Sequence, residues 1–253
     1  MNKTVSEIKD LLHGGKITKS DWDTILQDDR KGVQLLVKRY EKLKSQKEML
    51  RNKFYQMSEF ENRYRAKGIN NIAGVDEAGR GPLAGPVVVG AVILPQNFYL
   101  EGLDDSKKLN EGLRERFYKY IIEHAVSYSV TVIEPGEIDQ WNILEATKRG
   151  MVHSIHNLNT QPEVVLIDAV QLEIPFLQES LIKGDQRSIS IAAASIIAKV
   201  TRDRLMKEWG NKFPNYGFEK HMGYGTRDHL EALRKFGPTS IHRRTFSPVK
   251  EYL

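Results

Sequence analysis

The chain has 253 residues, with 38 Lys and Arg against 33 Asp and Glu and no cysteine. A chain of this length forms one large domain, or one domain with an appendage. The lack of cysteine excludes disulfides, thiolate zinc sites and a cysteine nucleophile. No apolar run approaches the roughly 20 residues that a membrane-spanning helix needs, and the N-terminal residues lack the apolar stretch of a secretory signal. We therefore expect a monomeric, cytoplasmic protein without a membrane partner.

Charge is distributed unevenly along the chain. Residues 1–69 contain 16 basic and 10 acidic residues, residues 70–185 contain 9 and 17, and residues 186–253 contain 13 and 6. An acidic middle therefore lies between two basic segments. This pattern would suit an anionic polymer that is held by the basic flanks while the acidic part gathers cations. Ordinary solubilising charge is the alternative, and charge alone favours it.

The first 69 residues are expected to form a separate helical extension. Thr4 and Glu7 have the spacing of a capping box, which predicts the start of a helix. Either Thr18 or Ser20 is a suitable N-cap for a second helix.

A long helix is expected over residues 30–65, which contain no proline and carry apolar residues close to helical spacing. Its other face, from Lys38 to Lys53, is rich in lysine and arginine. Two interpretations of this face stay open: an auxiliary nucleic-acid arm, or an amphipathic helix with a solvated basic surface. Residues 67–71 are the expected joint to a main domain over residues 70–253.

From residue 71, strand-like runs alternate with helical patterns. Strands are expected over residues 72–75, 86–94, 126–133, 163–168 and 180–185, and helices over residues 114–124, 141–158, 189–209 and 227–236. Strands first, followed by β–α alternation, predict an α/β domain with a mixed sheet flanked by helices. The C-terminal segment is expected to be helical.

Carboxylates follow three of the apolar, strand-like runs. Asp76 and Glu77 follow the first, Asp168 follows another, and Asp185 follows residues 180–184. Sites in open α/β sheets gather at the carboxyl ends of strands, so these side chains are expected to share a crevice. Their mutual repulsion would be relieved by divalent cations, and all-oxygen ligation favours Mg²⁺ or Mn²⁺. Taken singly, each acid is more readily explained as a cap, turn or surface residue.

Adjacent residues of a regular strand point to opposite faces. For Asp76 and Glu77 to reach one pair of metal ions, Glu77 is therefore expected at a distorted strand end.

A glycine-rich loop follows the first acidic pair. Residues 79–86 (GRGPLAGP) contain three glycines and two prolines. Glycines let backbone N–H and C=O groups come close to a ligand, and Arg80 can reach a phosphate. The spacing does not match a Walker or dinucleotide-binding fingerprint. A structural turn between two strands is the alternative that the pattern alone leaves open.

These motifs together resemble one known family, the bacterial type 2 ribonucleases H (ribonuclease HII). The resemblance covers about residues 70–250 in order, through residues 72–86 (IAGVDEAGRGPLAGP), 103–109 (LDDSKKL), 166–169 (LIDA), 183–185 (KGD), 192–203 (AAASIIAKVTRD), 216–218 (YGF), 221–226 (HMGYGT) and 242–246 (HRRTF). The sister type 3 enzymes usually have Lys at the Arg80 position, so the Gly-Arg-Gly sequence favours type 2. Residues 1–69 lie outside the shared core.

The resemblance implies an RNase H-like fold and endonucleolytic cleavage of RNA paired with DNA, including single ribonucleotides within duplex DNA. The family's four metal-site carboxylates fall on Asp76, Glu77, Asp168 and Asp185. They imply in-line phosphoryl transfer assisted by two ions of Mn²⁺ or Mg²⁺, with 5′-phosphate and 3′-hydroxyl products.

Substrate contacts are implied for a further group of residues. Gly79, Arg80 and Gly81 would offer backbone groups to the 2′-hydroxyl that distinguishes RNA from DNA, with the Arg80 side chain on a phosphate. Tyr224 would pack on the sugar beyond the ribonucleotide. Phosphate contacts are also expected from four basic side chains, which surface or capping roles would explain equally well: Lys107, Lys108, Lys199 and Arg202.

Two other classes of protein are weighed against this hypothesis. A non-catalytic hybrid-binding or scaffold protein would need a missing or disabled carboxylate, and none is missing. Another two-metal nuclease, such as a junction resolvase, is disfavoured because the Gly-Arg-Gly loop and the tyrosine serve to read a 2′-hydroxyl. The sequence leaves open which metal is preferred and how the extension docks.

Overall fold

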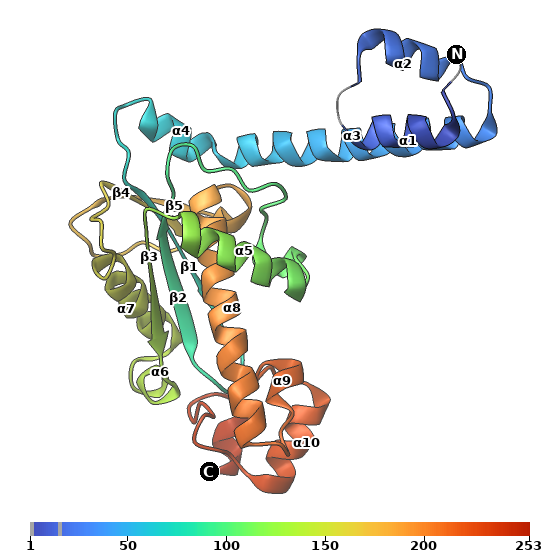
Figure 1. Cartoon of the computed structure of the whole chain (residues 1–253). Helices are drawn as coiled ribbons and strands as arrows, with labels where there is room; N and C mark the ends of the chain where they lie inside the picture. The colour runs from blue at the N-terminus through green and yellow to red at the C-terminus, as the bar shows by residue number, and fades with distance from the viewer. Residues whose placement is uncertain (1–2, 15–16) are drawn as a thin grey trace. The chain divides into compact units, whose positions relative to one another are not determined.

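The structure is a computed structural model that describes residues 3–14 and 17–253. The chain forms two compact units that divide between Lys53 and Phe54. Figure 1 labels the helices and strands in chain order. The predicted division at residues 69 and 70 stays a prediction.

The first unit is helical. Its elements are α1 (Val5–Gly14), α2 (Lys19–Leu26) and the first part of α3 (Lys31–Met57). The capping box before α1 is confirmed, because the Glu7 amide donates to Thr4 Oγ1 at 3.2 Å while Glu7 Oε2 accepts from the Thr4 amide. Of the two candidate caps for α2, the structure uses Thr18. The apolar core of the unit comprises Ile8, Leu12, Ile25, Val33 and Val37.

The long helix differs from its prediction in two ways. It breaks at Ser58, whose hydroxyl donates to the Phe54 carbonyl, and α4 (Glu59–Arg65) follows as a separate helix. The expected apolar stripe also ends early, because Leu43 and Leu50 are exposed. The basic side chains from Lys38 to Arg51 are exposed as well.

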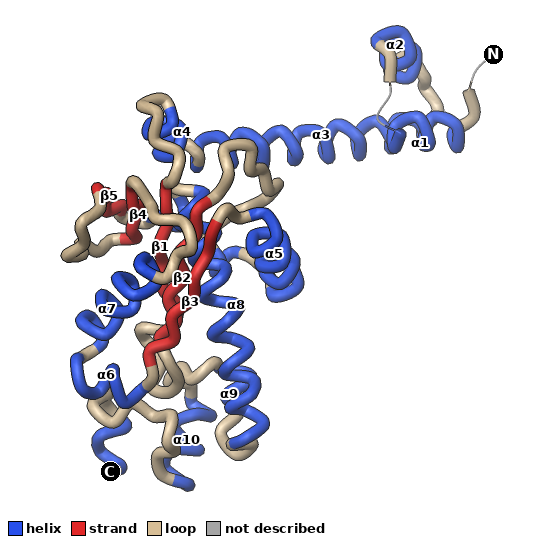
Figure 2. The backbone as a smooth tube through the Cα atoms, turned by 60° about the vertical axis from the view of Figure 1, so that its left-hand side comes forward, coloured by secondary structure: helices blue, strands red, loops and turns tan. Residues whose placement is uncertain are grey.

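The second unit is built on a five-stranded mixed sheet in the order β3-β2-β1-β4-β5. The strands are β1 (Ile72–Ala78), β2 (Val87–Ile93), β3 (Ser127–Ile133), β4 (Val164–Asp168) and β5 (Leu177–Leu181). The first three are antiparallel neighbours, whereas β1, β4 and β5 run parallel. Figure 2 shows the strands side by side in red. The carboxyl ends of β1 and β4 therefore lie at the same edge of the sheet.

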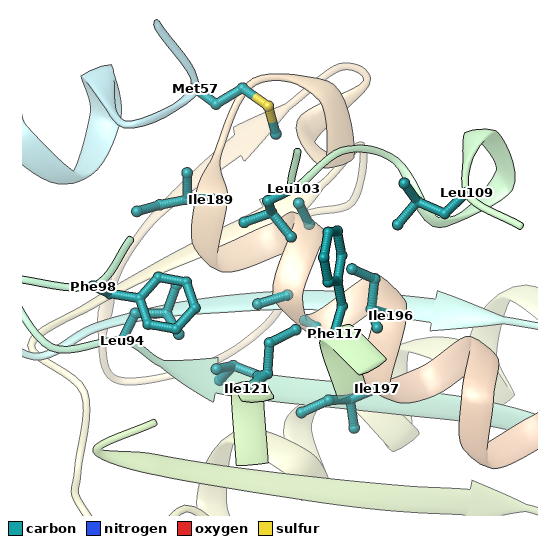
Figure 3. Packing of buried hydrophobic residues seen from close by; sticks show 14 of the residues in the cluster. Met57, Leu94, Phe98, Leu103, Leu109, Phe117, Ile121, Ile189, Ile196 and Ile197 are labelled. Atoms are coloured by element: carbon teal, nitrogen blue, oxygen red, sulfur yellow. The ribbon is translucent and has the colours of Figure 1, made fainter. Parts of the chain in front are cut away.

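Helices cover both faces of this sheet, and the faces follow from the alternation of side chains along the strands. On one face, Val75 and Val89 pack with Met151 and Ile155 of α7 (Ile143–His156). The other face packs against α8 (Ile189–Lys212). Figure 3 shows the core on the α8 side, where Phe117 and Ile121 of α5 (Glu111–His124) lie beside Ile196 and Ile197.

Two glycines bring α8 against the backbone of the sheet. A Cβ at Gly74 of β1 would lie 2.0 Å from the Ser190 carbonyl carbon, and one at Gly90 of β2 would lie 2.6 Å from the Ala194 oxygen. No side chain fits in either place, so helix and strand backbones are in direct contact. This approach sets the height of every α8 residue above the sheet.

The remaining elements complete the second unit. They are α6 (Pro135–Trp141), α9 (Phe218–His221), α10 (Arg227–Phe236) and the short 3₁₀ turns η1 (Ser106–Lys108), η2 (Gly184–Gln186) and η3 (Val249–Tyr252). The helix predicted over residues 141–158 corresponds to α7, which begins at Ile143 because the Asn142 side chain caps it, whereas Trp141 is the last residue of α6. The helix predicted over residues 227–236 is confirmed.

A buried carboxylate of α4 holds the start of α8. Glu61 is fully buried, and its Oε1 accepts from the Ser188 hydroxyl at 2.6 Å and the Ser190 amide at 2.9 Å. Ser188 is the N-cap of α8, so Glu61 satisfies groups that a helix start otherwise leaves without partners. Burial raises the pKa of Glu61, and the hydrogen bonds from α8 oppose that shift.

We predict that Glu61→Ala lowers the free energy of unfolding by about 1–3 kcal/mol, because it leaves buried donors without an acceptor. Urea unfolding followed by circular dichroism measures this difference. Glu59→Ala, on an exposed position of the same helix, is the matched control and should lie within about 0.5 kcal/mol of the unmodified protein. Equal stability of the two variants would contradict the capping role.

Candidate active site at the carboxyl edge of the sheet

Asp76 and Glu77 lie near the end of β1. Asp76 pairs with Gly90 of β2, and Glu77 pairs with the next residue, Val89. The ladder is therefore regular, and the predicted strand distortion at Glu77 is wrong. Asp76 is buried on the α8 face, and its Oδ1 accepts from the Glu77 amide at 2.7 Å. Glu77 leaves the strand on the opposite face.

Asp168 and Asp185 come from neighbouring segments. Asp168 is the last residue of β4, and its Oδ1 accepts from the Gly184 amide at 2.7 Å. Asp185 is buried in η2. The strand predicted over residues 180–185 lies earlier in the chain, as β5 (Leu177–Leu181). After β5 the chain turns, and Lys183 adopts a left-handed conformation with φ of 56°. This turn brings Asp185 back beside the end of β4.

The four carboxylates influence one another electrostatically. Burial raises the pKa of Asp76 well above its usual value, and the charge of Glu77 adds to the effect. Burial also raises the pKa of Glu77, although Arg80 opposes this with an ion pair of 3.3 Å. The pKa of Asp185 rises to about 6 through burial and the charges of Asp105 and Asp168. These side chains therefore form one acidic group that lacks sufficient positive charge.

Besides Arg80, Lys107 faces this group. Its Nζ lies 3.9 Å from Asp185 Oδ2, and its side chain is 77% exposed. Burial alone would lower the pKa of Lys107, but the net shift is upward because Asp76, Asp105, Asp185 and Asp168 all favour its charged form. One ammonium group thus responds to carboxylates from four separate segments of the chain.

A divalent cation fits the chemistry of this group, although its present side-chain arrangement is not that of a metal site. Within residues 3–14 and 17–253, no three acidic or histidine side chains converge closely enough to bind one ion. Glu77 Oε2 is nevertheless buried without a hydrogen-bond partner. A buried, unpaired carboxylate oxygen among other carboxylates is the kind of hard ligand that Mg²⁺ and Mn²⁺ bind.

A cavity of about 230 Å³ lies beside the acidic group. Eight of the twelve predicted site residues line it: Glu77, Gly79, Arg80, Gly81, Lys107, Lys199, Arg202 and Tyr224. The Tyr224 side chain comes within 3.7 Å of the place where a Cβ on Gly81 would lie. The glycine loop and the tyrosine are therefore adjacent in space, although 143 positions separate Gly81 from Tyr224 in the sequence. A larger cavity, of about 550 Å³ beside α7, contains none of the predicted residues.

The expected phosphate-binding residues differ in how they are placed. Lys107 is exposed beside the acids, whereas Lys108 pairs with Asp104 at 3.5 Å. Lys199 pairs with Asp203 at 2.5 Å. Arg202 is only 1% exposed and donates to backbone carbonyls, so its guanidinium is committed inside the protein.

Several residues near the site carried no assignment from the sequence. Asp105 is 5% exposed, and its charge raises the pKa of Asp185. Ser195 of α8 lies beside Asp76, and its hydroxyl shares a hydrogen bond of 2.9 Å with the Ser106 hydroxyl. All three residues fall within motifs that the chain shares with the family, and this was the only sequence pattern that could have pointed to them: Asp105, Ser106 and Ser195. Their burial depends on how η1 and α8 pack, and no local pattern reports that.

A pair of buried histidines supports the backbone of Tyr224. The Thr239 amide donates to His242 Nδ1 at 2.9 Å, so the proton of neutral His242 is on Nε2. That N–H donates to His229 Nε2 at 3.0 Å, and His229 Nδ1 donates to the Tyr224 carbonyl at 2.9 Å. Burial lowers the pKa of His229, and it lowers the pKa of His242 to about 4, which keeps both rings neutral at neutral pH.

Comparison with known proteins assigns the family. The profile of ribonuclease HII matches residues 73–249, and that of the ribonuclease HII N-terminal domain matches residues 4–65. The chain belongs to the ribonuclease HII family. It is 51% identical to the ribonuclease HII of Bacillus cereus (strain B4264) over 251 residues, which cover 99% of this chain and 98% of the relative. With that of Bacillus mycoides (strain KBAB4), it shares 54% identity over 229 residues, or 90% and 89% of the two chains. The chain is therefore an endonuclease of the ribonuclease H class, which acts on RNA/DNA hybrids.

Solved structures support the RNase H-like fold of the sheet and its helices. The ribonuclease H2 of Pyrococcus horikoshii OT3 superimposes with a TM-score of 0.63 at 29% identity, covering 72% of this chain and 96% of that one. The RNase HII in a complex with PCNA from Archaeoglobus fulgidus gives a TM-score of 0.60 at 29% identity, covering 70% and 95%. Bst-RNase HIII, solved in complex with Mn²⁺, is 20% identical with a TM-score of 0.56, covering 74% and 71%, and shares the fold. In the described part of the chain, no helix combines the length and apolar character required to cross a membrane.

Proposed function

We propose that this ribonuclease HII family member hydrolyses the RNA strand of RNA/DNA hybrids and also nicks 5′ of single ribonucleotides embedded in duplex DNA. The products would carry 5′-phosphate and 3′-hydroxyl ends. We further propose that Asp76, Glu77, Asp168 and Asp185 bind two divalent cations, Mg²⁺ or Mn²⁺. The observation that carries the proposal is the buried acidic group beside a cavity lined by the glycine loop and Tyr224.

The acidic group supports the metal-dependent part of this proposal. Its carboxylates come from β1, β4 and η2. The raised pKa values of Asp76, Glu77 and Asp185 indicate that nearby positive charge is insufficient. Bound cations would supply the Lewis acidity that activates a water molecule and stabilises the leaving 3′ oxygen. Glu77 would have to exchange its ion pair with Arg80 for a metal ligand role, which would free Arg80 to contact a phosphate.

The cavity supports the selection of ribonucleotides. Gly79 and Gly81 bring backbone close to the cavity, and Tyr224 is 48% exposed beside Gly81. A 2′-hydroxyl can donate and accept hydrogen bonds, so backbone groups at this position would distinguish ribose from deoxyribose. The Tyr224 ring would pack on the neighbouring sugar, while Lys107 and Arg80 offer charge to phosphates.

We predict that Asp76→Asn and Asp168→Asn each reduce the cleavage rate by more than about a hundredfold. Loss of a residue that only hydrogen-bonds to a metal ligand already lowers metal affinity or activity by about 10–100-fold. Cleavage is measured on a long hybrid and on duplex DNA with one ribonucleotide, each with Mg²⁺, Mn²⁺ or chelator. Hybrid binding should largely survive.

The matched control for these variants is Asp228→Asn, on an exposed position of α10, which should cleave at the normal rate. Near-normal cleavage by Asp76→Asn would contradict the proposed ligand role. If the unmodified protein gave no metal-dependent nick on either substrate, a hybrid-binding scaffold would be the better description.

The role of Tyr224 gives a second prediction. Loss of an aromatic stacking partner is worth about 1–3 kcal/mol, so Tyr224→Ala should lower kcat/KM on the single-ribonucleotide duplex by about 5–150-fold. Tyr224→Phe keeps the ring and should stay within a few-fold of the unmodified protein. Tyr128→Ala, on an exposed position of β3, is the control. Equal rates for Tyr224→Ala and Tyr224→Phe would refute a stacking role.

The basic face of α3 gives a third prediction. We propose that it contacts phosphates of the duplex, because the side chains from Lys38 to Arg51 are exposed. A variant that combines Lys38→Gln, Lys42→Gln, Lys44→Gln and Lys47→Gln should therefore show a weaker salt dependence. The slope of the logarithm of the binding constant against the logarithm of the salt concentration should become shallower by about 0.9 for each lost contact. Gln at Lys9 and Lys19, on α1 and α2, is the control. An unchanged slope would leave α3 with a structural role only.

A further inference from the structure

Arg202 and Arg243 lie behind the loop of residues 79–86, with exposures of 1% and 0%. Arg202 approaches the second half of the loop. Its Nε donates to the Pro86 carbonyl at 2.9 Å, and its Nη2 donates to the Ala84 carbonyl at 3.2 Å. Arg202 thereby fixes the segment in which the loop joins β2.

Arg243 approaches the first half of the same loop. Its Nη2 donates to the Gly79 carbonyl at 2.5 Å and its Nη1 to the Arg80 carbonyl at 2.8 Å, while its Nε donates to the Gly85 carbonyl at 3.0 Å. One planar guanidinium thus holds three carbonyls at fixed angles, which an ammonium group cannot reproduce. The acceptors of all three hydrogen bonds are backbone oxygens of the loop.

These bonds determine where the loop amides point. A trans peptide is planar, so the C=O of one residue and the N–H of the next point in opposite directions. Because Arg243 holds the Gly79 and Arg80 carbonyls inside, the N–H groups of Arg80 and Gly81 are turned away from it. Within the described part of the chain, neither of these two amides has a hydrogen-bond acceptor.

The two free amides belong to residues that line the cavity. Arg80 and Gly81 are both exposed, and Gly81 adjoins the Tyr224 ring. By contrast, the Leu83 amide donates to the Gly223 carbonyl and the Gly85 amide to the Ile241 carbonyl. The loop therefore directs its donors selectively, with those at its start available to a ligand and those at its end used inside the protein.

Burying two guanidinium groups is unfavourable, which argues that they are kept for a reason other than filling space. Burial lowers the pKa of Arg202 to about 10, and burial together with the charge of Arg202 lowers the pKa of Arg243 to about 9. Both remain charged at neutral pH. Their hydrogen bonds polarise the peptide groups between them and the cavity, which makes the outward N–H groups stronger donors.

We propose that Arg243, supported by Arg202, is a positioning residue that orients the Arg80 and Gly81 amides toward the ribose 2′-hydroxyl and so determines the preference for ribonucleotides. This inference rests on the proposed function, because it assumes that the loop contacts ribose. Arg243 itself touches no substrate, and its effect passes through the two peptide planes that it holds.

The test measures binding of two duplexes by fluorescence anisotropy in the presence of chelator, so that cleavage does not enter. One duplex is all DNA, and the other has the same sequence with one ribonucleotide. The dissociation constant of the all-DNA duplex divided by that of the ribonucleotide duplex should fall by about tenfold in Arg243→Met. This is roughly the factor that one hydrogen bond contributes. Arg243→Lys should show a similar fall, because it keeps the charge but not the planar fork.

Arg244→Met, on the exposed neighbouring position, is the matched control and should keep the normal ratio. If Arg243 had a purely structural role, its variants would bind both duplexes more weakly in proportion to the unfolded fraction, and the ratio of the two dissociation constants would not change. An unchanged ratio in folded Arg243→Lys would overturn the proposal. If the unmodified protein itself bound both duplexes equally, the proposed reading of ribose would fail instead.

If neither Arg243 variant folds, amide spectra of the unmodified protein provide the second measurement. The Arg80 and Gly81 signals should shift when the ribonucleotide duplex is added and shift much less with the all-DNA duplex. The same shifts with both duplexes would overturn the proposed orientation.

Discussion

The direct contact of α8 with the backbones of β1 and β2 is the constraint on which the site depends. Gly74 and Gly90 leave no side chain between helix and sheet, so α8 runs past the carboxyl edge of the sheet at a fixed, short distance. Ser195 therefore lies beside Asp76, and Lys199 and Arg202 line the cavity. A bulkier residue at either glycine would displace all three side chains together, because they share one rigid helix.

The acidic group shows how the protein tolerates an arrangement that is unfavourable by itself. Asp76 and Asp185 are removed from water, yet Lys107 remains largely exposed and offers only a distant positive charge. The protein thus keeps carboxylates in an environment that favours their protonated forms. Such a group gains most from the arrival of a concentrated positive charge, and this is the physical reason to associate it with divalent cations.

Much of the architecture was predictable from the sequence, because long apolar runs and helical periodicity reflect burial directly. The β2 run is apolar on both faces, and α10 is strongly amphipathic, so both were located closely. The position of β5 was predicted wrongly because its apolar and polar residues alternate poorly and Leu177 is exposed at the edge of the sheet. The regular register at Glu77 was also missed, since only the partner strand β2 defines it.

The burial and contacts of the candidate site residues could not be predicted from the motifs. The motifs identified the acids, the glycine loop and Tyr224, but they did not indicate that Arg202 and Arg243 are buried. Arginine is normally exposed, and three-carbonyl coordination depends on segments that are distant in sequence. For the same reason, no local pattern indicated that Glu61 packs with α8 rather than in an independent extension.

The insertion of Glu61 at the start of α8 bears on how the nuclease core can be trimmed. A fragment beginning at residue 70 would contain every residue of the candidate site, yet it would lose α4 and with it the carboxylate that accepts from Ser188 and Ser190. It would also uncover an apolar surface that includes Leu166 and Ile191, which Phe60 and Tyr64 otherwise shield. The smallest self-sufficient version of the enzyme should therefore begin upstream of α4.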